Sequence, residues 1–419
     1  MQIKLNGEKM IAAAIMLLII YLCLPISMIV LGSFSIRLIA FFSAFFFLFA
    51  LLLMRKWDYL LIITALMMIL FLYWRTAWHV KIQSYYYVAY CFFCLIFVFG
   101  GMALSSSNDH RAVKCLFLFA TLVVALTSIT TIWGLRIYPL AAREIARGST
   151  YNTDLDFTEY KQIYRKMNIA GWSQIYGMLF CIPPAFMLWR RKKRAFYAVM
   201  AILIFAMIVF SQITFAVLLS VLFFVDFIFC KGNDRKAVFL RLLFLLLAIV
   251  LIINIDSILS AAISLFQENE FEYLSTKLSD LRELLLAKDA VGDAEARGAL
   301  YRTSLDSFLS SPFWGLAFAQ NDTSELLGFH SEFFDMLGAL GIIGFMAIIA
   351  SLFAFYRFLK EIKKDYRQIL FIDYAGFVIL FVLNPVFHSP QIFFGAFFYP
   401  LIACRYASFQ EQETKKLIF

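Results

Sequence analysis

Charged residues are scarce in this sequence. Only 16% of its 419 residues are Asp, Glu, Lys or Arg, whereas 63% are apolar and 49 are Phe. A soluble domain carries about 25% charged and about 45–50% apolar residues, so the composition excludes an ordinary water-soluble fold. The chain instead contains many apolar runs of about 20 residues, the length that crosses a bilayer. We therefore predict an all-α polytopic membrane protein.

Motifs for nucleotides, metals and disulfides are also missing. Neither a GxxxxGK(S/T) loop nor a GxGxxG loop occurs, which argues against an ATP-driven or nucleotide-sugar mechanism. The 7 cysteines lie in or beside apolar runs and are expected to be small buried side chains. Cys91 and Cys94 form a CxxC without a second pair or a matching histidine. We expect no metal, no cofactor and, because topology explains the net charge of +9, no nucleic-acid partner.

The apolar runs predict about twelve transmembrane helices, whose ends are uncertain by several residues. They are expected at residues 10–33, 36–54, 58–74, 85–104, 113–135, 168–189, 195–211, 213–230, 237–256, 330–356, 369–385 and 391–404.

The distribution of Lys and Arg predicts the orientation of these spans. Clusters such as "RRKKR" and "RFLKEIKKDYR" occupy the short connections on one side, while the short connections on the other side are nearly bare. The positive-inside rule then places both termini in the cytoplasm. The predicted organisation is a transmembrane bundle at 1–256 with an external loop at 136–167, an external loop at 257–329 between spans 9 and 10, three last spans at 330–404, and a cytoplasmic tail at 405–419.

The external loop at 257–329 is expected to be partly helical. In "YLSTKLSDLRELLLAK", leucines recur at helical spacing with charges on the other faces, which is typical of an amphipathic helix on a membrane or protein surface. A second helix, in "DAEARGALYRTSLDSFLSS", is expected to end before Pro312. Its spacing places Arg297, Tyr301 and Ser304 on one side of that helix.

Two motifs follow this second helix. "SPFWG" spans residues 311–315, and "GFHSEFFDMLGALGIIG" spans 328–344 with His330 at its start. An external arginine, a "P-x-x-G" segment and then a histidine before glycine-spaced apolar residues resemble the signature of the O-antigen ligase and O-antigen polymerase family. The late, large external loop agrees with the resemblance, which implies a fold similar to the GT-C glycosyltransferases.

The resemblance implies a metal-independent glycosyltransferase whose donor is a polyprenyl-diphosphate glycan. It carries Arg297 over as a catalytic and diphosphate-binding residue and His330 as the catalytic histidine. Thr214 stands where the family often has a further arginine, so Arg165 and Lys166 become candidates for binding the diphosphate. Supporting roles fall to Tyr301, Ser331, Glu332 and Asp335, although the two acidic residues could equally be interfacial charges and His330 could simply anchor a helix.

Three functions remain open from the sequence. A polymerase would extend a glycan on polyprenyl-diphosphate-linked repeat units to form O-antigen or capsular polysaccharide, and a ligase would transfer the glycan to a lipid core or a protein. A glycolipid flippase is the alternative of another class. For the polymerase we expect a multi-pass protein of the bacterial cytoplasmic membrane with an external active site. Its partners would be the lipid-linked glycan donor and acceptor and membrane lipid, with a chain-length regulator and a flippase as further candidates.

The orientation can be tested by thiol labelling. Cysteines introduced at Asp280 and Asn321 should react with a membrane-impermeant thiol reagent in intact cells, because both lie in the predicted external loop. A cysteine at Lys193, in a predicted cytoplasmic turn, should react only after the membrane is opened. The reverse pattern would place the predicted catalytic side in the cytoplasm.

Overall fold

A computed structural model describes residues 6–78, 82–148, 157–229, 254–268, 279, 282, 288–318 and 327–418. The described chain is an all-α polytopic membrane protein. Its helices are α1 (Gly7–Cys23), α2 (Ser27–Val30), α3 (Gly32–Leu53), α4 (Trp57–Trp78), α5 (Ile82–Ser105), α6 (His110–Ile137), α7 (Ala141–Arg147), α8 (Phe157–Lys166), α9 (Trp172–Leu179), α10 (Ile182–Lys192), α11 (Ala195–Ser211), α12 (Thr214–Phe229), α14 (Ile255–Glu268), α16 (Lys288–Ser310), η1 (Leu316–Phe318), α17 (Glu332–Glu361), α18 (Lys364–Leu383), α19 (Pro390–Phe393), η2 (Phe394–Phe398) and α20 (Tyr399–Ile418).

The predicted spans agree closely with these helices. By length and composition, 6 described helices can cross a membrane: Trp57–Thr76, Tyr87–Ser105, His110–Ile137, Glu332–Glu361, Tyr366–Leu383 and Pro390–Glu413. Shorter apolar helices cover the predicted spans at 36–54, 195–211 and 213–230. The span predicted at 237–256 lies almost entirely outside the described residues, as does most of the amphipathic helix predicted after residue 272. The count of twelve therefore stays a prediction.

Three predicted spans are broken rather than continuous. The segment 10–33 forms α1, α2 and the start of α3, and it is interrupted at residues 24–26, around Pro25. The segment 168–189 forms α9 and α10, which meet at Phe180 and Cys181 just before Pro183 and Pro184. Proline cannot donate a helical backbone hydrogen bond and fits best in the first turn of a helix, so α10 begins there. The segment 391–404 passes from α19 through η2, a π-helical turn, into α20.

The core of the bundle lies around the last span. In Pro390–Glu413, 89% of the most apolar window is buried, whereas the corresponding share in Trp57–Thr76 is 28%. The low buried share of Trp57–Thr76 places α4 at the lipid-facing periphery of the bundle. Of the buried cysteines, Cys91 and Cys94 both donate to the carbonyl of Phe387, at 3.2 and 3.3 Å. Cys115 was expected to be buried but is exposed, because it lies on an outward face of α6.

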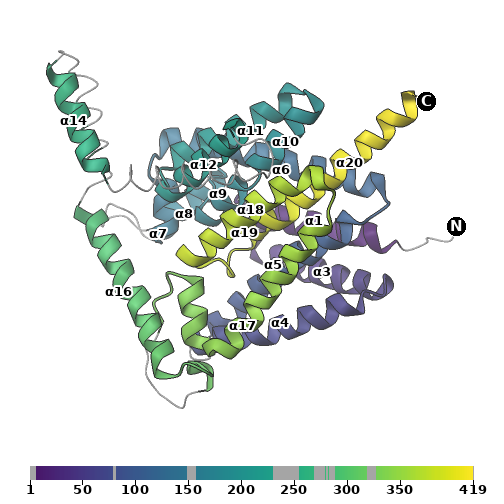
Figure 1. The fold of residues 1–419 in the computed structure, drawn as a ribbon, viewed down its shortest axis with the longest axis horizontal. Coiled ribbons are helices and arrows are strands. Elements are labelled where there is room, and N and C mark those ends of the chain that lie inside the picture. The colour runs from purple at the N-terminus through teal and green to yellow at the C-terminus, as the bar shows by residue number, and fades with distance from the viewer. Residues whose placement is uncertain are drawn as a thin grey trace.

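The two ends of the molecule differ in what they carry. Figure 1 shows both termini at one end of the bundle and the helices α14 and α16 at the opposite end. Helix α16, from the predicted external loop, leads through the "SPFWG" turn to α17, against which it packs. The loop that contains α16 thus lies across the molecule from the two termini.

The "SPFWG" turn is bonded to a break in α17. Gly341 interrupts that helix with φ 61° and ψ −174°, which frees backbone amides beyond it. The amide of Ile342 donates to the carbonyl of Pro312 at 2.8 Å, and that of Ile343 to Phe313 at 3.3 Å. Because unpaired backbone groups are costly inside a membrane, the turn satisfies a need that the break creates. The two sequence motifs therefore form one structural unit.

Glycine at position 315 is required by this unit. Its φ is 69°, and a Cβ there would collide with the backbone of Gly341 and Ala339. Gly315→Ala should destabilise the protein by on the order of 3 kcal/mol through backbone strain and overpacking. The measurement is the thermal unfolding temperature of the purified protein in detergent.

Gly298→Ala is the matched control, since Gly298 lies in α16 and a Cβ added there would meet no atom within 4 Å. It should leave the unfolding temperature unchanged or slightly raised, because alanine favours helix more than glycine does. Equal unfolding temperatures for the two variants would contradict a bonded turn.

Candidate functional site

Asp335 fixes the backbone on both sides of His330. Its Oδ1 accepts from the Ser304 hydroxyl at 2.5 Å and from the Phe329 amide at 3.2 Å, and its Oδ2 accepts from the Ser331 amide at 3.3 Å. The Asp335 side chain is buried, with 1% exposure, so it is not an interfacial charge. Phe329 has φ 54°, a left-handed conformation that is unfavourable for a bulky residue. The carboxylate stabilises this turn and sets the position of His330.

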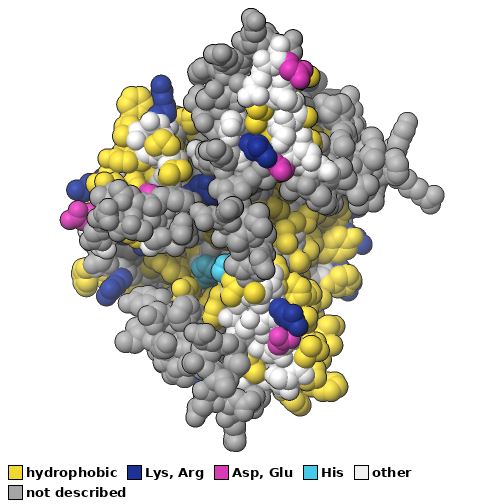
Figure 2. Space-filling model, turned by 90° about the vertical axis from the view of Figure 1, so that its left-hand side faces the viewer, with side chains coloured by type: hydrophobic (Ala, Val, Ile, Leu, Met, Phe, Trp, Pro, Cys, Tyr) yellow, Lys and Arg dark blue, Asp and Glu magenta, His cyan; other side chains and the backbone are white. Residues whose placement is uncertain are grey.

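His330 is exposed, whereas Gly328 and Ser331 on either side of it are buried. Its Nδ1 lies 3.0 Å from the carbonyl oxygen of Gly328. A carbonyl only accepts, so the hydrogen bond places the proton on Nδ1 and leaves the lone pair of the neutral ring on Nε2. Ser331, and not His330, caps α17, because its hydroxyl accepts from the Phe334 amide. Figure 2 shows histidine side chains in a recess near the centre of the face that carries α14 and α16.

Glu332 holds a second segment against the start of α17. Its Oε2 accepts from the amides of Val386 at 2.6 Å and Phe387 at 2.8 Å, and its own amide donates to Asn384. The Ser331 hydroxyl adds a bond to the carbonyl of Val382 at 2.5 Å. These contacts bring the turn between α18 and α19 beside His330. The Glu332 side chain has 0% exposure, and its hydrogen bonds hold this turn against the start of α17.

His388 lies at the end of the turn that Glu332 holds. Its ring is edge-on to the rings of Trp74 and Tyr87, with centroids 6.0 and 5.7 Å apart. Burial lowers the pKa of His388 to about 4, so its imidazole is neutral at physiological pH. Within the described chain its Nδ1 is buried and has no hydrogen-bond partner. The hydrogen bonds of Glu332 place the segment of His388 next to that of His330.

Helix α16 supplies the predicted polar face. The hydroxyl of Tyr301 donates to the carbonyl of Leu383 at 3.0 Å, and its ring stacks on Phe334 with centroids 5.6 Å apart. Ser304 is buried against Asp335. Arg297 lies in α16 seven residues before Ser304, which corresponds to about 10 Å along the helix axis. The structure describes its backbone and not its side chain.

Arg165 and Lys166 lie in the last turn of α8, in the other predicted external loop. This helix is fixed by the Tyr164 hydroxyl, which donates to Glu144, and burial and this bond raise the pKa of Tyr164. Asn168 then joins the segment to α6 through a bond from its Nδ2 to Thr130 at 2.8 Å. Arg165 is half-buried and Lys166 is exposed. No contact between either cation and His330 is recorded among the described residues.

A groove of about 330 Å³ opens beside these cations. It is lined by Ile129, Thr130, Trp133 and Met167, the residue that follows Lys166. Trp133 is 64% exposed, which is typical of an aromatic side chain at a membrane surface. The groove therefore joins an apolar surface to a basic turn.

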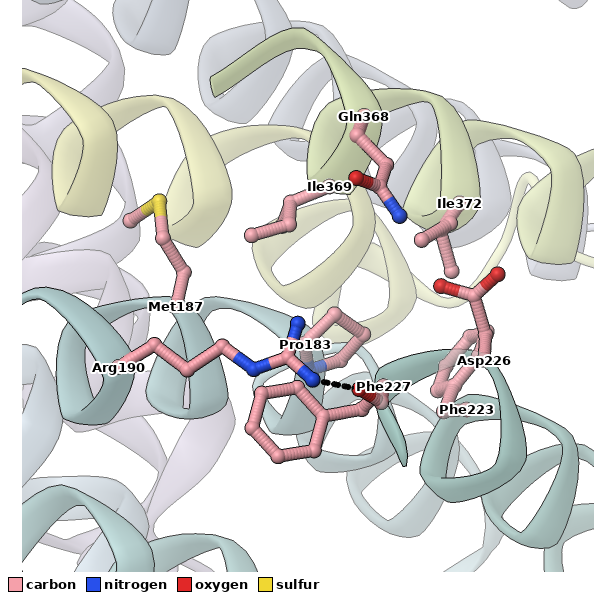
Figure 3. Close-up of a pocket in the computed structure, with 9 residues that line it drawn as sticks. All are labelled: Pro183, Met187, Arg190, Phe223, Asp226, Phe227, Gln368, Ile369 and Ile372. Carbon is pink, nitrogen blue, oxygen red and sulfur yellow. Dashed lines mark hydrogen bonds between the residues drawn. The ribbon is translucent and has the colours of Figure 1, made fainter. Parts of the chain in front are cut away.

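A second cavity lies between α10, α12 and α18 (Figure 3). Arg190 stacks over the ring of Phe227 at 3.7 Å and donates to its carbonyl, while Asp226 and Gln368 face the same space. The cavity measures about 50 Å³, and ligand pockets usually measure about 300–1,000 Å³. It lies beside the basic turn predicted to be cytoplasmic. We therefore assign no glycan site to it.

The described residues contain no group of three or more His, Cys, Asp or Glu side chains that could hold a metal ion. The bonds of Glu332 and Asp335 to backbone amides explain why these acidic residues gather at the start of α17.

A comparison with protein families matches residues 173–349 to O-antigen ligase. This part of the chain is similar to the O-antigen ligase family. The matched segment runs from α9 into α17 and includes Arg297, the "SPFWG" turn and His330. Arg165 and Lys166 lie just before it. No curated protein and no solved structure matched the chain.

Sequence reasoning named Glu332 and Asp335 as supporting residues but could not give their hydrogen-bond partners. The hydrogen bonds of Glu332 span more than fifty residues of sequence, as the bond to Val386 with a separation of 54 shows. The helix-anchoring role that the sequence allowed for His330 belongs instead to Ser331, which caps α17.

Asp335→Asn tests the fixation of His330 without any assay of activity. The amide nitrogen of Asn cannot accept from the Ser331 amide, so backbone exchange at residues 328–331 should become roughly tenfold faster or more. Hydrogen–deuterium exchange with mass spectrometry measures it. Asp306→Asn, at an exposed position of α16, is the control. Unchanged exchange in Asp335→Asn would show that Asp335 does not hold the turn.

Proposed function

We propose that this protein polymerises polyprenyl-diphosphate-linked oligosaccharide repeat units into O-antigen or capsular polysaccharide on the outer face of the bacterial cytoplasmic membrane. The observation that carries the proposal is the state of His330: an exposed imidazole with Nδ1 bonded to a carbonyl, set in a turn that a buried carboxylate fixes. The match to O-antigen ligase supports the substrate class, since it contains this histidine.

The free Nε2 of His330 suits it to act as a base. An acceptor hydroxyl gives its proton to Nε2 while the oxygen forms a bond to the anomeric carbon of the donor. The bond from that carbon to the diphosphate oxygen breaks, and the electron pair leaves with the polyprenyl diphosphate. The imidazolium then releases its proton to water. Such base catalysis typically contributes about a hundredfold to ten-thousandfold.

The leaving diphosphate needs positive charge near His330. Arg297 is the candidate, because α16 is fixed to α17 through Ser304 and presents residue 297 about 10 Å further along its axis. A guanidinium stays charged and binds phosphate oxygens through two parallel hydrogen bonds, so it can stabilise the leaving group without a metal. The groove at Trp133 and Met167, beside Lys166, offers an apolar surface to an isoprenoid chain.

A ligase would use the same chemistry with a different acceptor, so the acceptor decides between the two reactions. Thr214 replaces an arginine that is common in the family. This difference favours a polymerase, because polymerases diversify strongly in sequence. A flippase would need ionisable residues in the middle of the membrane, commonly in pairs. Helix α18 carries a buried carboxyl group, Asp373, for which the described chain provides no hydrogen-bond partner. Asp373 is a single carboxyl group and does not form such a pair among the described residues.

His330→Ala should abolish polymer while protein level and membrane insertion stay normal. The lipid-linked single repeat unit should accumulate, because its supply and transport across the membrane do not use this residue. Gel analysis of the polysaccharide and extraction of the lipid-linked unit measure both effects. The purified protein should polymerise this unit with EDTA present and without a nucleotide.

His110→Ala is the control, since His110 begins α6 and stacks on Phe409 of α20, on the predicted cytoplasmic side. It should retain polymer. A loss below about tenfold in His330→Ala would contradict base catalysis. Transfer of the glycan to a lipid core, with no lipid-linked polymer formed, would identify a ligase.

A further inference from the structure

Three half-buried tyrosines form a row at the end of the bundle that carries His330. Tyr21 lies near the end of α1, and Tyr90 and Tyr87 lie one turn apart on α5. The rings of Tyr21 and Tyr90 pack edge-on against the same side chain, Phe93, with centroids 6.1 and 6.2 Å from its ring. We call Tyr21, Tyr90 and Tyr87 the tyrosine row.

One end of the tyrosine row meets positive charge. The amide of Ile26, five residues after Tyr21, donates to Oδ1 of Asn168 at 3.0 Å, and Asn168 follows closely after Arg165 and Lys166. The basic last turn of α8 therefore lies beside this end of α1. An anionic group of a ligand would be stabilised here.

The other end of the row meets the two histidine segments. Tyr87 stacks on Trp74 with centroids 4.5 Å apart and lies edge-on to His388. His388 directly follows Phe387, whose amide is bonded to Glu332, and Glu332 is two residues from His330. The row thus runs from the basic turn of α8 to the turn of His388, which Glu332 bonds to the start of α17.

Tyrosine can bind a sugar chain through both its aromatic ring and its hydroxyl group. Its ring gives a rigid apolar surface for the C–H faces of a sugar at little entropic cost, and its hydroxyl exchanges hydrogen bonds with sugar hydroxyls. A row of such side chains binds a chain of sugars, whereas the basic end requires an anion. A glycan that carries a diphosphate at one end has both features.

Resting on the proposed function, we infer that the tyrosine row is the acceptor site, which binds one lipid-linked repeat unit lengthwise. Its diphosphate lies at Arg165 and Lys166, its sugars lie along Tyr21, Tyr90 and Tyr87, and its terminal hydroxyl reaches His330. Arg297 then serves the donor diphosphate. The two cation sites therefore correspond to the two lipid diphosphates that meet in one polymerisation step.

Binding of two unreactive probes to the purified protein tests the row. The first probe is the repeat-unit oligosaccharide, released by mild acid from the lipid-linked unit of His330→Ala cells. The second is farnesyl diphosphate, which has the diphosphate and an isoprenoid but no sugar. Tyr90→Leu should weaken binding of the oligosaccharide roughly three- to tenfold, and Tyr90→Phe less than threefold, because Phe keeps the ring.

The two probes separate a binding role from structural damage. Tyr90→Leu should leave the Kd of farnesyl diphosphate within about twofold, whereas Arg165→Ala should weaken that probe more than it weakens the oligosaccharide. Tyr59→Leu is the control, since Tyr59 is a half-buried tyrosine that packs on Phe99 from α4. A Tyr90→Leu variant that loses both probes equally, or that matches Tyr59→Leu, overturns the inference, and Tyr87→Leu repeats the test if Tyr90→Leu does not fold.

A reaction assay distinguishes acceptor from donor. With the lipid-linked unit as donor, the wild-type protein should extend the free oligosaccharide, and Tyr90→Leu should make less of this lipid-free product. Binding of the oligosaccharide without extension would show that the row holds the donor glycan and would overturn the acceptor assignment. If the wild-type protein forms no polymer at all from the lipid-linked unit, the proposed function fails, while the binding results still decide whether the row binds sugar.

Discussion

Burial of the Asp335 carboxylate at the start of a membrane helix demands hydrogen-bond donors, and the fold supplies them from separate parts of the chain. The donors are the Ser304 hydroxyl of α16 and the amides of Phe329 and Ser331. An unsatisfied buried carboxylate would be strongly destabilising, so these parts must come together when the bundle folds. The exposed histidine is thereby held between two bonded amides, which fixes the position of the base proposed above.

Glu332 repeats this arrangement three residues earlier. Both carboxylates belong to the first turn of α17, where the positive end of the helix dipole favours negative charge. One carboxylate fixes the turn of His330, and the other fixes the turn that ends at His388. A single helix end therefore organises both histidine segments. This explains why acidic side chains appear at the membrane border with 0% and 1% exposure.

Structural features that depend on local sequence pattern could be predicted. Features that depend on contacts between distant parts of the chain could not. Apolar run lengths predicted most spans, because the bilayer imposes them, and helical spacing placed Tyr301 and Ser304 on one side of α16. The breaks at Phe180 and in η2 escaped because the apolar pattern continues through them. Tyr87 and Tyr90 gave no signal because aromatic residues are common at membrane surfaces. The bonds of Glu332 to Val386 and Phe387 required the folded bundle.

The hydrogen bonds between the "SPFWG" turn and the break in α17 at Gly341 determine when the second half of α16 becomes ordered. The carbonyls of Pro312 and Phe313 bind α17 through Ile342 and Ile343, and Ser304 binds it through Asp335. The second half of α16 is thus immobilised when the protein folds, and its ordering entropy is not lost again in each turnover. For the proposed reaction, the groups on this half of α16 are placed near His330 before any substrate binds, as in an intramolecular reaction. That reaction requires no closure of this part of the loop in each turnover.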